Sequence, residues 1–196
     1  NDGFIKQTIL SDMLPKAYKK KTSMAIKLKT DSSYVVGIAY FKQAKQQDVL
    51  LLSHDGVGLR FKVTDVPEIG PRTAGVKAMD LRGTDTIMAA LFITNDSQQV
   101  AIVASNGAFK YMPISEINRS KRANKGLLIF TQKKTVAYHV AAATIFEAHE
   151  MALEILTTRW QAQELQLSDY HPSQRIGNGQ YVDAGKTNGT PWVLKT

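Results

Sequence analysis

Basic side chains recur at one point of a repeating pattern in this 196-residue sequence. Four ten-residue segments, each directly after an acidic residue, contain ten Lys or Arg residues and a single acid. The rest of the chain is almost balanced in charge, although the whole chain carries +8. Lysine and arginine neutralise phosphates and release counterions from DNA, so this grouping predicts a polyanion-binding surface. The segments are 13–22, 66–75, 117–126 and 170–179, and their cations are Lys16, Lys19, Lys20, Lys21, Arg72, Arg119, Lys121, Arg122, Lys125 and Arg175.

Further basic residues lie near these segments. Lys77 follows the second segment, and we include it among the predicted DNA-binding residues. A weaker series follows the predicted hairpin turns, where ordinary exposed strand residues are an equally good interpretation. Cations that recur at one phase of a repeat fall on one face of the assembly, so we expect a continuous basic surface. The weaker series is Lys6, Arg60, Lys62 and Lys110.

The repeat that positions these cations has a period of 51 to 53 residues. One marker opens each copy, and an acidic residue follows it nine positions later. A fixed period of this length is typical of stacked or radially arranged copies of one supersecondary unit. The opening markers are Gly3, Gly56, Gly107 and Trp160, and the acidic residues are Asp12, Asp65, Glu116 and Asp169.

Each copy reads as about four short antiparallel strands separated by turns. The pairs Asp2-Gly3, Asp55-Gly56 and Asn106-Gly107 predict type I′ hairpin turns, which need positive φ at both central residues. Short strands of even spacing predict an all-β, propeller-like fold of about four blades. The later strands of the copies are predicted at Met24–Leu28 and Gly75–Met79, and then at Tyr34–Tyr40, Thr86–Phe92, Thr135–Val140 and Pro191–Leu194.

The segment Ala141–Trp160 has an apolar spacing that also fits an amphipathic helix. It belongs to a gapless match in which residues 89–117 lie over residues 142–170 at an offset of 53. Local helix propensity is a weak prior that tertiary context overrides. We therefore predict strands in this segment.

Composition limits the class of protein. The chain is long enough for one domain, 1–196, and no shift in composition marks a second. It has no cysteine, so disulfides and thiolate metal sites are excluded. No apolar run is long enough to span a bilayer. Because the first copy begins at its turn and the fourth stops early, we expect a fragment of a longer polypeptide, with ring closure left open.

Recognisable catalytic motifs are missing from the sequence. We find no phosphate-binding or dinucleotide-binding glycine loop. His54, His139, His149 and His171 are scattered, and the nearest pair lacks metal-ligand spacing, so we predict neither a metal site nor catalytic residues. No recognition helix is apparent either. The expected mode of DNA binding is therefore electrostatic contact along a basic edge, with bending of the duplex.

Several motifs resemble a known family. His54–Phe61, Val66–Val76 and Met79–Leu81 with Asp85 are similar to a repeat of the C-terminal domain of bacterial type IIA topoisomerase A subunits. Asn106–Lys110 followed by Lys125-Gly126 resembles another repeat. The resemblance implies a β-pinwheel, a propeller-like ring of four-stranded blades that binds and bends DNA on its outer edge.

Gyrase and topoisomerase IV share this domain. In gyrase, the resemblance implies an intact Gln-Arg-Arg-Gly-Gly-Lys-Gly box. Here the nearest match is Gln174–Gln180, which keeps the Gln, the first Arg and the first Gly but loses the second Arg and the Lys. A degenerate box in the last copy favours the DNA-cleaving polypeptide of topoisomerase IV, of a Gram-positive type. The gyrase wrapping domain stays open as the alternative.

The resemblance also implies partners and cofactors. The complete enzyme would contain two A subunits and two B subunits, and would use ATP and Mg²⁺ outside this segment, which itself needs no cofactor. The domain would present double-stranded DNA for decatenation and relaxation in the cytoplasm, associated with the nucleoid or with the inner face of the membrane. Two other classes stay open: a propeller scaffold for an acidic protein or polysaccharide, and an enzyme with a site in the central channel.

Overall fold

The structure is a computed structural model, and it describes residues 1–14, 24–42, 47–131, 138–157, 161–182 and 191–195. Antiparallel strands form nearly all of its regular structure, as predicted. A single α-helical turn, α1 (Leu10–Met13), precedes the first gap. Within the described residues, no helix is long and apolar enough to cross a membrane.

The second and third blades are complete four-stranded sheets. The second blade has the strand order β5-β2-β3-β8, and the third has β9-β6-β7-β12. Their strands are β2 (Asp48–Ser53), β3 (Val57–Lys62), β5 (Ile87–Ile93) and β8 (Leu127–Leu128), then β6 (Gln99–Ala104), β7 (Ala108–Pro113), β9 (Val140–Phe146) and β12 (Gln180–Tyr181).

The first and fourth blades have fewer strands in the described part of the chain. The first pairs β1 with β4, and the fourth has the order β11-β10-β13. A short 3₁₀ helix that ends at the acidic marker follows β3, β7 and β11. The strands are β1 (Phe4–Ile5), β4 (Val76–Lys77), β10 (Ala152–Thr157), β11 (Ala162–Gln166) and β13 (Pro191–Lys195), and the 3₁₀ helices are Val63–Asp65, Ile114–Glu116 and Leu167–Asp169.

Each outer strand belongs to the repeat that follows its blade. The strand β8 of the third repeat pairs with β3, and β12 of the fourth pairs with β7. In the same way β4 of the second repeat pairs with β1. The sequence analysis placed all four strands of a unit in one blade, so it missed this exchange. The exchange carries the basic segments of the second, third and fourth repeats across to the blade of the preceding repeat.

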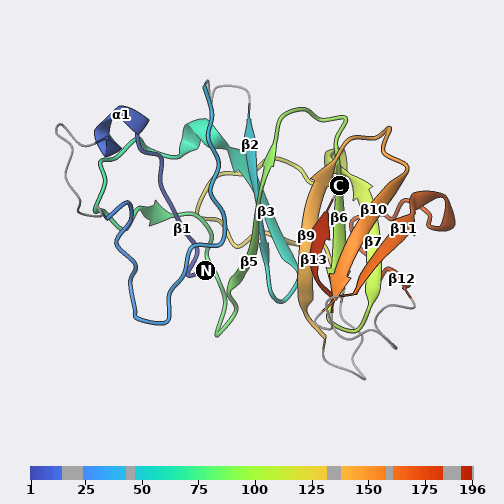
Figure 1. Cartoon of the computed structure of the whole chain (residues 1–196). Coiled ribbons are helices and arrows are strands. Elements are labelled where there is room, and N and C mark those ends of the chain that lie inside the picture. The colour runs from blue at the N-terminus through green and yellow to red at the C-terminus, as the bar shows by residue number, and fades with distance from the viewer. Residues whose placement is uncertain (15–23, 43–46, 132–137, 158–160, 183–190, 196) are drawn as a thin grey trace.

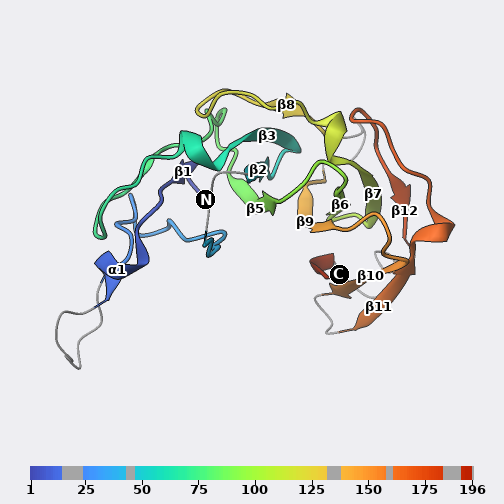
Figure 2. The same cartoon turned by 90° about the horizontal axis from the view of Figure 1, so that it is seen from above.

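The blades follow an arc. Seen from above, β8 and β12 lie on its outer side, whereas β5 and β9 face the inner side (Figure 2). In the side view the strands of neighbouring blades stand face to face (Figure 1). The outer edge of the arc is therefore formed by the exchanged strands and the segments that precede them.

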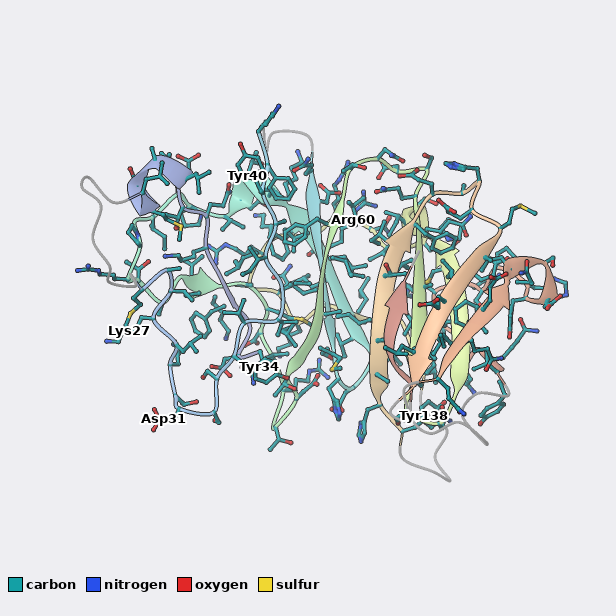
Figure 3. All side chains as sticks on the ribbon, viewed as in Figure 1. Lys27, Asp31, Tyr34, Tyr40, Arg60 and Tyr138 are labelled. Carbon is teal, nitrogen blue, oxygen red and sulfur yellow. The ribbon has the colours of Figure 1, made fainter. Side chains whose placement is uncertain are left out.

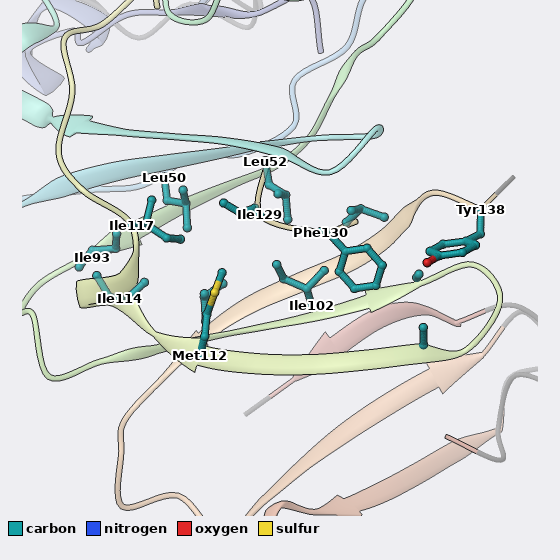
Figure 4. Packing of buried hydrophobic residues seen from close by; sticks show 14 residues of the cluster. Leu50, Leu52, Ile93, Ile102, Met112, Ile114, Ile117, Ile129, Phe130 and Tyr138 are labelled. Atoms are coloured by element: carbon teal, nitrogen blue, oxygen red, sulfur yellow. The ribbon is translucent and has the colours of Figure 1, made fainter. Parts of the chain in front are cut away.

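The core fills the spaces between blades. Successive side chains of a strand point to opposite faces, so Leu50 and Leu52 pack toward the third blade while Val49 and Leu51 pack toward the first. Ile102, from β6, meets Leu50 and Leu52 in one buried cluster (Figure 4). Because β2 is buried on both faces, the stability of each blade depends on its neighbours.

The predicted strands in Ala141–Trp160 are confirmed. The strands β9 and β10 occupy this segment in place of a helix, apart from residues 158–160, which lie outside the described residues. Their positions repeat those of β5 and β6 at the offset of 53. Of the strand predicted at Thr135–Val140, residues 135–137 lie outside the described residues, Tyr138 and His139 are not in a strand, and β9 begins at Val140.

Two predicted strands of the first copy are wrong. Neither Met24–Leu28 nor Tyr34–Tyr40 is a strand in the structure. In the later blades the innermost strand pairs with the strand that precedes the hairpin turn. In the first copy that turn is Asp2-Gly3. Tyr34 bonds Asn1 beside it, and the residues that follow Tyr34 border a cavity of about 740 Å³.

The hairpins are present, but their turns are not of the predicted type. The φ angle is positive at Gly56 and Gly107 but not at Asp55 or Asn106. The N–H of Gly56 bonds the carbonyl of Ser53 at 3.1 Å. These features fit a three-residue loop in which a β-turn is followed by a glycine in the left-handed region, rather than a two-residue type I′ turn.

Candidate nucleic-acid interface

The basic segments of the second, third and fourth repeats are held on the outer side of the preceding blade by equivalent backbone bonds. The N–H groups of Ile69, Ser120 and Ser173 bond the blade at equivalent positions, with distances of 2.8 to 2.9 Å. Their acceptors are the carbonyls of Gln7, Arg60 and Tyr111. Two of the segments also share a positive φ, 69° at Arg72 and 66° at Ala123. The repeated geometry therefore presents the segments in the same way.

The same three blade residues add side-chain bonds. The amide of Gln7 donates to the carbonyls of Val63 and Val66, at 2.7 and 2.8 Å. The Tyr111 hydroxyl donates to the Tyr170 carbonyl at 3.2 Å. These carbonyls flank the 3₁₀ helices from which the basic segments begin. One strand position thus anchors the start of each segment.

Arg60 is the arginine form of this anchor, which corrects the prediction that it is an exposed residue contacting DNA. It is 3% exposed, and its guanidinium donates to the carbonyls of Ile114 and Ile117. Its Nε also donates to the buried carboxylate of Asp48 at 2.7 Å. Figure 3 shows Arg60 between the second and third blades. Since these partners take up its donors, Arg60 is structural.

Asp96 is the second carboxylate bound by Arg60. The hydrogen bond from Arg60 lowers the pKa of Asp96 below its ordinary value, and burial opposes that shift only in part. Asp48 also accepts from Nε of Arg119 at 2.6 Å. The predicted interface residue Arg119 is therefore about half exposed and already paired with a carboxylate.

Lys110 is also buried, contrary to the prediction of an exposed strand residue. It is 2% exposed, and its Nζ donates to the carbonyls of Ile129, Gln174 and Arg175 at 2.6, 3.2 and 2.9 Å. Burial and, to a smaller extent, the charge of nearby Arg175 lower the pKa of Lys110 to about 8, against the opposing effect of Glu116. Lys110 therefore fixes the segment that contains the degenerate box.

Lys6 occupies the equivalent position in the first repeat. Its Nζ donates to the Gly70 carbonyl at 2.9 Å, and Gly70 corresponds in the repeat to Gln174. Burial lowers the pKa of Lys6 below its ordinary value. Lys6 is partly exposed, whereas Lys62, the last member of the weaker series, is exposed at the end of β3.

Two arginines of the main series fasten the exchanged strands. Arg122 donates to the carbonyl of Lys77, and Arg175 donates to the carbonyl of Leu128 at 2.8 Å. These bonds are equivalent in the repeat, and both arginines are half-buried. A guanidinium has five donors, so each arginine keeps donors that can face a phosphate.

The remaining cations of the described segments are exposed. Arg72, Lys121 and Lys125 make no hydrogen bond or ion pair with other described residues. Lys77 pairs with Asp80, whose pKa is lowered mainly by that bond and also by the charges of Lys125 and Arg82. The sequence analysis missed Arg82, because it lies outside the basic segments. Lys16, Lys19, Lys20 and Lys21 lie outside the described residues.

Comparison with known proteins agrees with this architecture. The family model described as "DNA gyrase C-terminal domain, beta-propeller" matches residues 47–94 and 98–135. The A subunit of DNA topoisomerase 4 from Streptococcus pyogenes serotype M1 is 30% identical over 92% of this chain, and the same protein from Bacillus subtilis is 26% identical over 100%. The chain spans about a quarter of the length of these relatives, 24% in both cases.

A solved structure, the C-terminal domain of DNA topoisomerase IV, matches with a TM-score of 0.84 and 25% identity, over 98% of this chain and 58% of the other. The predicted resemblance to the C-terminal domains of topoisomerase A subunits is confirmed. The gyrase A C-terminal domain has the same fold, with a TM-score of 0.65 and 18% identity over 77% of this chain and 49% of its own. The β-pinwheel predicted for this family is therefore the fold of the chain.

Proposed function

We propose that the outer edge of the arc binds duplex DNA without sequence selection and bends it. The observation that carries the proposal is the recurrence of a basic segment, fixed in the same way, beside β4, β8 and β12. Contacts between cations and phosphates give affinity without reading bases. A series of such contacts on a convex edge favours DNA that curves around it.

The exposed cations are assigned to phosphate contact. Arg72, Lys77, Lys121 and Lys125 are the principal residues in the described segments, and Arg119, Arg122 and Arg175 contribute the donors that their structural bonds leave over. Lys19, Lys20 and Lys21, which lie outside the described residues, are assigned to phosphate contact by their place in the repeat. Lys62 and Lys6 are assigned a weaker contribution. Arg60 and Lys110 support the surface from within.

In the complete protein, this domain would belong to the DNA-cleaving polypeptide of topoisomerase IV. The names of the relatives support that assignment, and the degenerate box at Gln174–Gln180 favours it over gyrase. The domain would hold a bent duplex for an ATP-dependent core made of two A subunits and two B subunits, and so favour decatenation and relaxation. Mg²⁺ and ATP would act in that core.

Charge reversal of single lysines tests the binding surface. Lys121→Glu and Lys125→Glu each remove one phosphate contact, so each should flatten the slope of log K against log salt by about 0.9. Lys42→Glu is the matched control, because Lys42 is also an exposed lysine but lies outside the basic segments. Fluorescence anisotropy with a labelled duplex measures all three. Equal slopes for all variants and the wild type would refute the assignment.

Competition distinguishes DNA binding from a scaffold for other acidic partners. Duplex DNA, heparin and an acidic protein are titrated against the labelled complex at two salt concentrations. A bent-duplex site predicts that duplex DNA competes best, and that energy transfer between dyes on the two duplex ends rises on binding. Stronger competition by the acidic protein would favour the scaffold.

A further inference from the structure

Two histidines that are far apart in the sequence meet at the junction of the second and third blades. His54 is the residue after β2, and His139 is the residue before β9. Their rings stack with centroids 3.9 Å apart and planes inclined by 18°. Asp55, in the same hairpin turn as His54, lies beside both rings. The histidines that looked scattered in the sequence are therefore paired by the fold.

Backbone bonds fix the positions of these residues. The N–H of Val140 donates to the carbonyl of His54 at 3.0 Å, which joins the two blades beside the rings. The His54 N–H donates to the Thr86 carbonyl at 2.8 Å, and the His139 carbonyl accepts from Ser105 at the same distance. The backbones that carry the two histidines are thus fixed to the neighbouring strands.

The donor atoms converge without satisfying one another. Nδ1 of His54 and Nδ1 of His139 each lie 3.6 Å from Oδ1 of Asp55, which is beyond the usual hydrogen-bond range. Nδ1 of His139 is buried and has no hydrogen-bond partner. One ligand atom from each of the three residues lies within 4.8 Å of the others. A nitrogen shielded from water and left unpaired indicates that another group belongs between these atoms.

We propose that His54, His139 and Asp55 bind a divalent transition metal, with Zn²⁺ as the fitting ion. Zinc takes imidazole nitrogen and carboxylate oxygen at about 2.0–2.2 Å in a tetrahedron, which places its ligands somewhat over 3 Å apart. The 3.6 Å separations are close to this value, and the stacked rings would tilt apart so that both nitrogens face the ion. Two nitrogen donors disfavour Mg²⁺ and Ca²⁺, which prefer oxygen.

The fourth position of this site would be filled by water. The side chains of His54 and His139 are each 41% exposed and that of Asp55 is 53% exposed, so solvent reaches the ligands. The ion would join the β2–β3 turn of one blade to the residue before β9 of the next. That turn and the start of β9 lie at the same end of the blades in Figure 1. Because the ion binds only the folded arrangement, it would stabilise that junction.

The repeat supplies substitutions that the fold already accepts. At the equivalent positions the third copy has Ser105 for His54 and Asn106 for Asp55, and the second copy has Thr86 for His139. His54→Ser, Asp55→Asn and His139→Thr therefore remove the ligands while keeping residues known at these places in a blade. His149→Ala and His171→Ala are the matched controls, because both histidines are exposed and neither belongs to the cluster.

The test measures metal bound by the purified chain without a polyhistidine tag, after treatment with a chelator. Equilibrium dialysis should find one Zn²⁺ per chain in the wild type and both controls, and loss of that ion in His54→Ser and His139→Thr. Zn²⁺ should also raise the melting temperature of the wild type and of both controls, but not that of His54→Ser or His139→Thr. Melting in chelator shows whether each variant is folded.

Cobalt gives a second readout. Co²⁺ bound by the three ligands and water should give the intense visible absorption of a four-coordinate site, and Asp55→Asn should change that spectrum. Absence of bound Zn²⁺ in the wild type would overturn the proposal. Equal binding by the wild type and His139→Thr would overturn it too, since the ion would then lie elsewhere.

Discussion

Arg60 and Lys110 are cations, yet each donates its hydrogen bonds to other groups of the protein. Arg60 holds Asp48 and two carbonyls, and Lys110 holds carbonyls of the segment that contains Gln174. A buried charge is tolerated when its donors and charge are compensated. The sequence could not reveal this burial, because the fold brings in compensating carbonyls from distant residues, such as Ile114 for Arg60 and Gln174 for Lys110. Burial and bonds to backbone carbonyls therefore distinguish the supporting cations from the candidates for DNA contact.

Asp48 is central to the network around Arg60. Asp48→Ala should lower the free energy of unfolding by about 3–5 kcal/mol, because it leaves Arg60 buried without its main partner. Asp96→Ala removes the other carboxylate, which is 58% exposed, and should cost only about 0–1 kcal/mol. Urea unfolding followed by circular dichroism measures both. Similar losses for the two variants would contradict this description of the network.

Lys110 should give stability a distinctive pH dependence. The pKa of Lys110 is about 8 in the folded chain and ordinarily 10.5. Between pH 8 and pH 10.5, Lys110 therefore binds a proton in the unfolded chain but has largely lost it in the folded chain. Stability contributed by this group therefore rises with pH across that window. Relative to Lys110→Met, the wild type should gain up to about 3 kcal/mol from pH 8 to pH 10.5.

Unfolding of both proteins in urea at several pH values measures that difference. Lys62→Met serves as the control, because Lys62 is an exposed lysine near the end of the neighbouring β3. Its pH profile should follow that of the wild type. A constant difference between the wild type and Lys110→Met across the window would show that the buried lysine does not release its proton there.

The strands follow the sequence repeat closely. The strands β6, β9 and β10, and the 3₁₀ helix Leu167–Asp169, fall where the fixed offset puts them. The offset also predicted strands in a segment whose local pattern favours a helix. The exchange of outer strands was not predictable in this way, because a repeat fixes which residues are equivalent but not which blade they join. The pairing of His54 with His139 was not predictable either, because it depends on how the second and third blades pack together.

The hairpin glycines connect the turns to the following repeat. At Gly56, φ is +85°, and an added Cβ would lie 2.5 Å from the carbonyl oxygen of Phe130. Gly56→Ala should therefore cost more than about 1–2 kcal/mol, the penalty of the left-handed conformation alone. Gly70→Ala is the control, since its Cβ would meet nothing within 4 Å. Thermal unfolding compares them, and an equal melting temperature for both variants would show that the close approach is unimportant.

The whole molecule is an arc of blades whose convex side carries the exchanged strands and their basic segments (Figure 2). The sequence places the excess of positive charge in the four basic segments, and the fold sets the second, third and fourth of these beside β4, β8 and β12. The sequence could not distinguish exposed Lys121 from half-buried Arg122, since that depends on the carbonyl of Lys77. The residues proposed to contact DNA are therefore fewer than the cations predicted from the sequence.

The salt dependence of duplex binding by the wild-type chain tests the central proposal most directly. About six phosphate contacts on the outer edge predict a loss of roughly a thousandfold in affinity between 50 and 200 mM salt. The loss should be the same for duplexes of unrelated sequence, because no base is read. An affinity that changes little over this range, or that differs strongly between sequences, would contradict electrostatic binding along the edge.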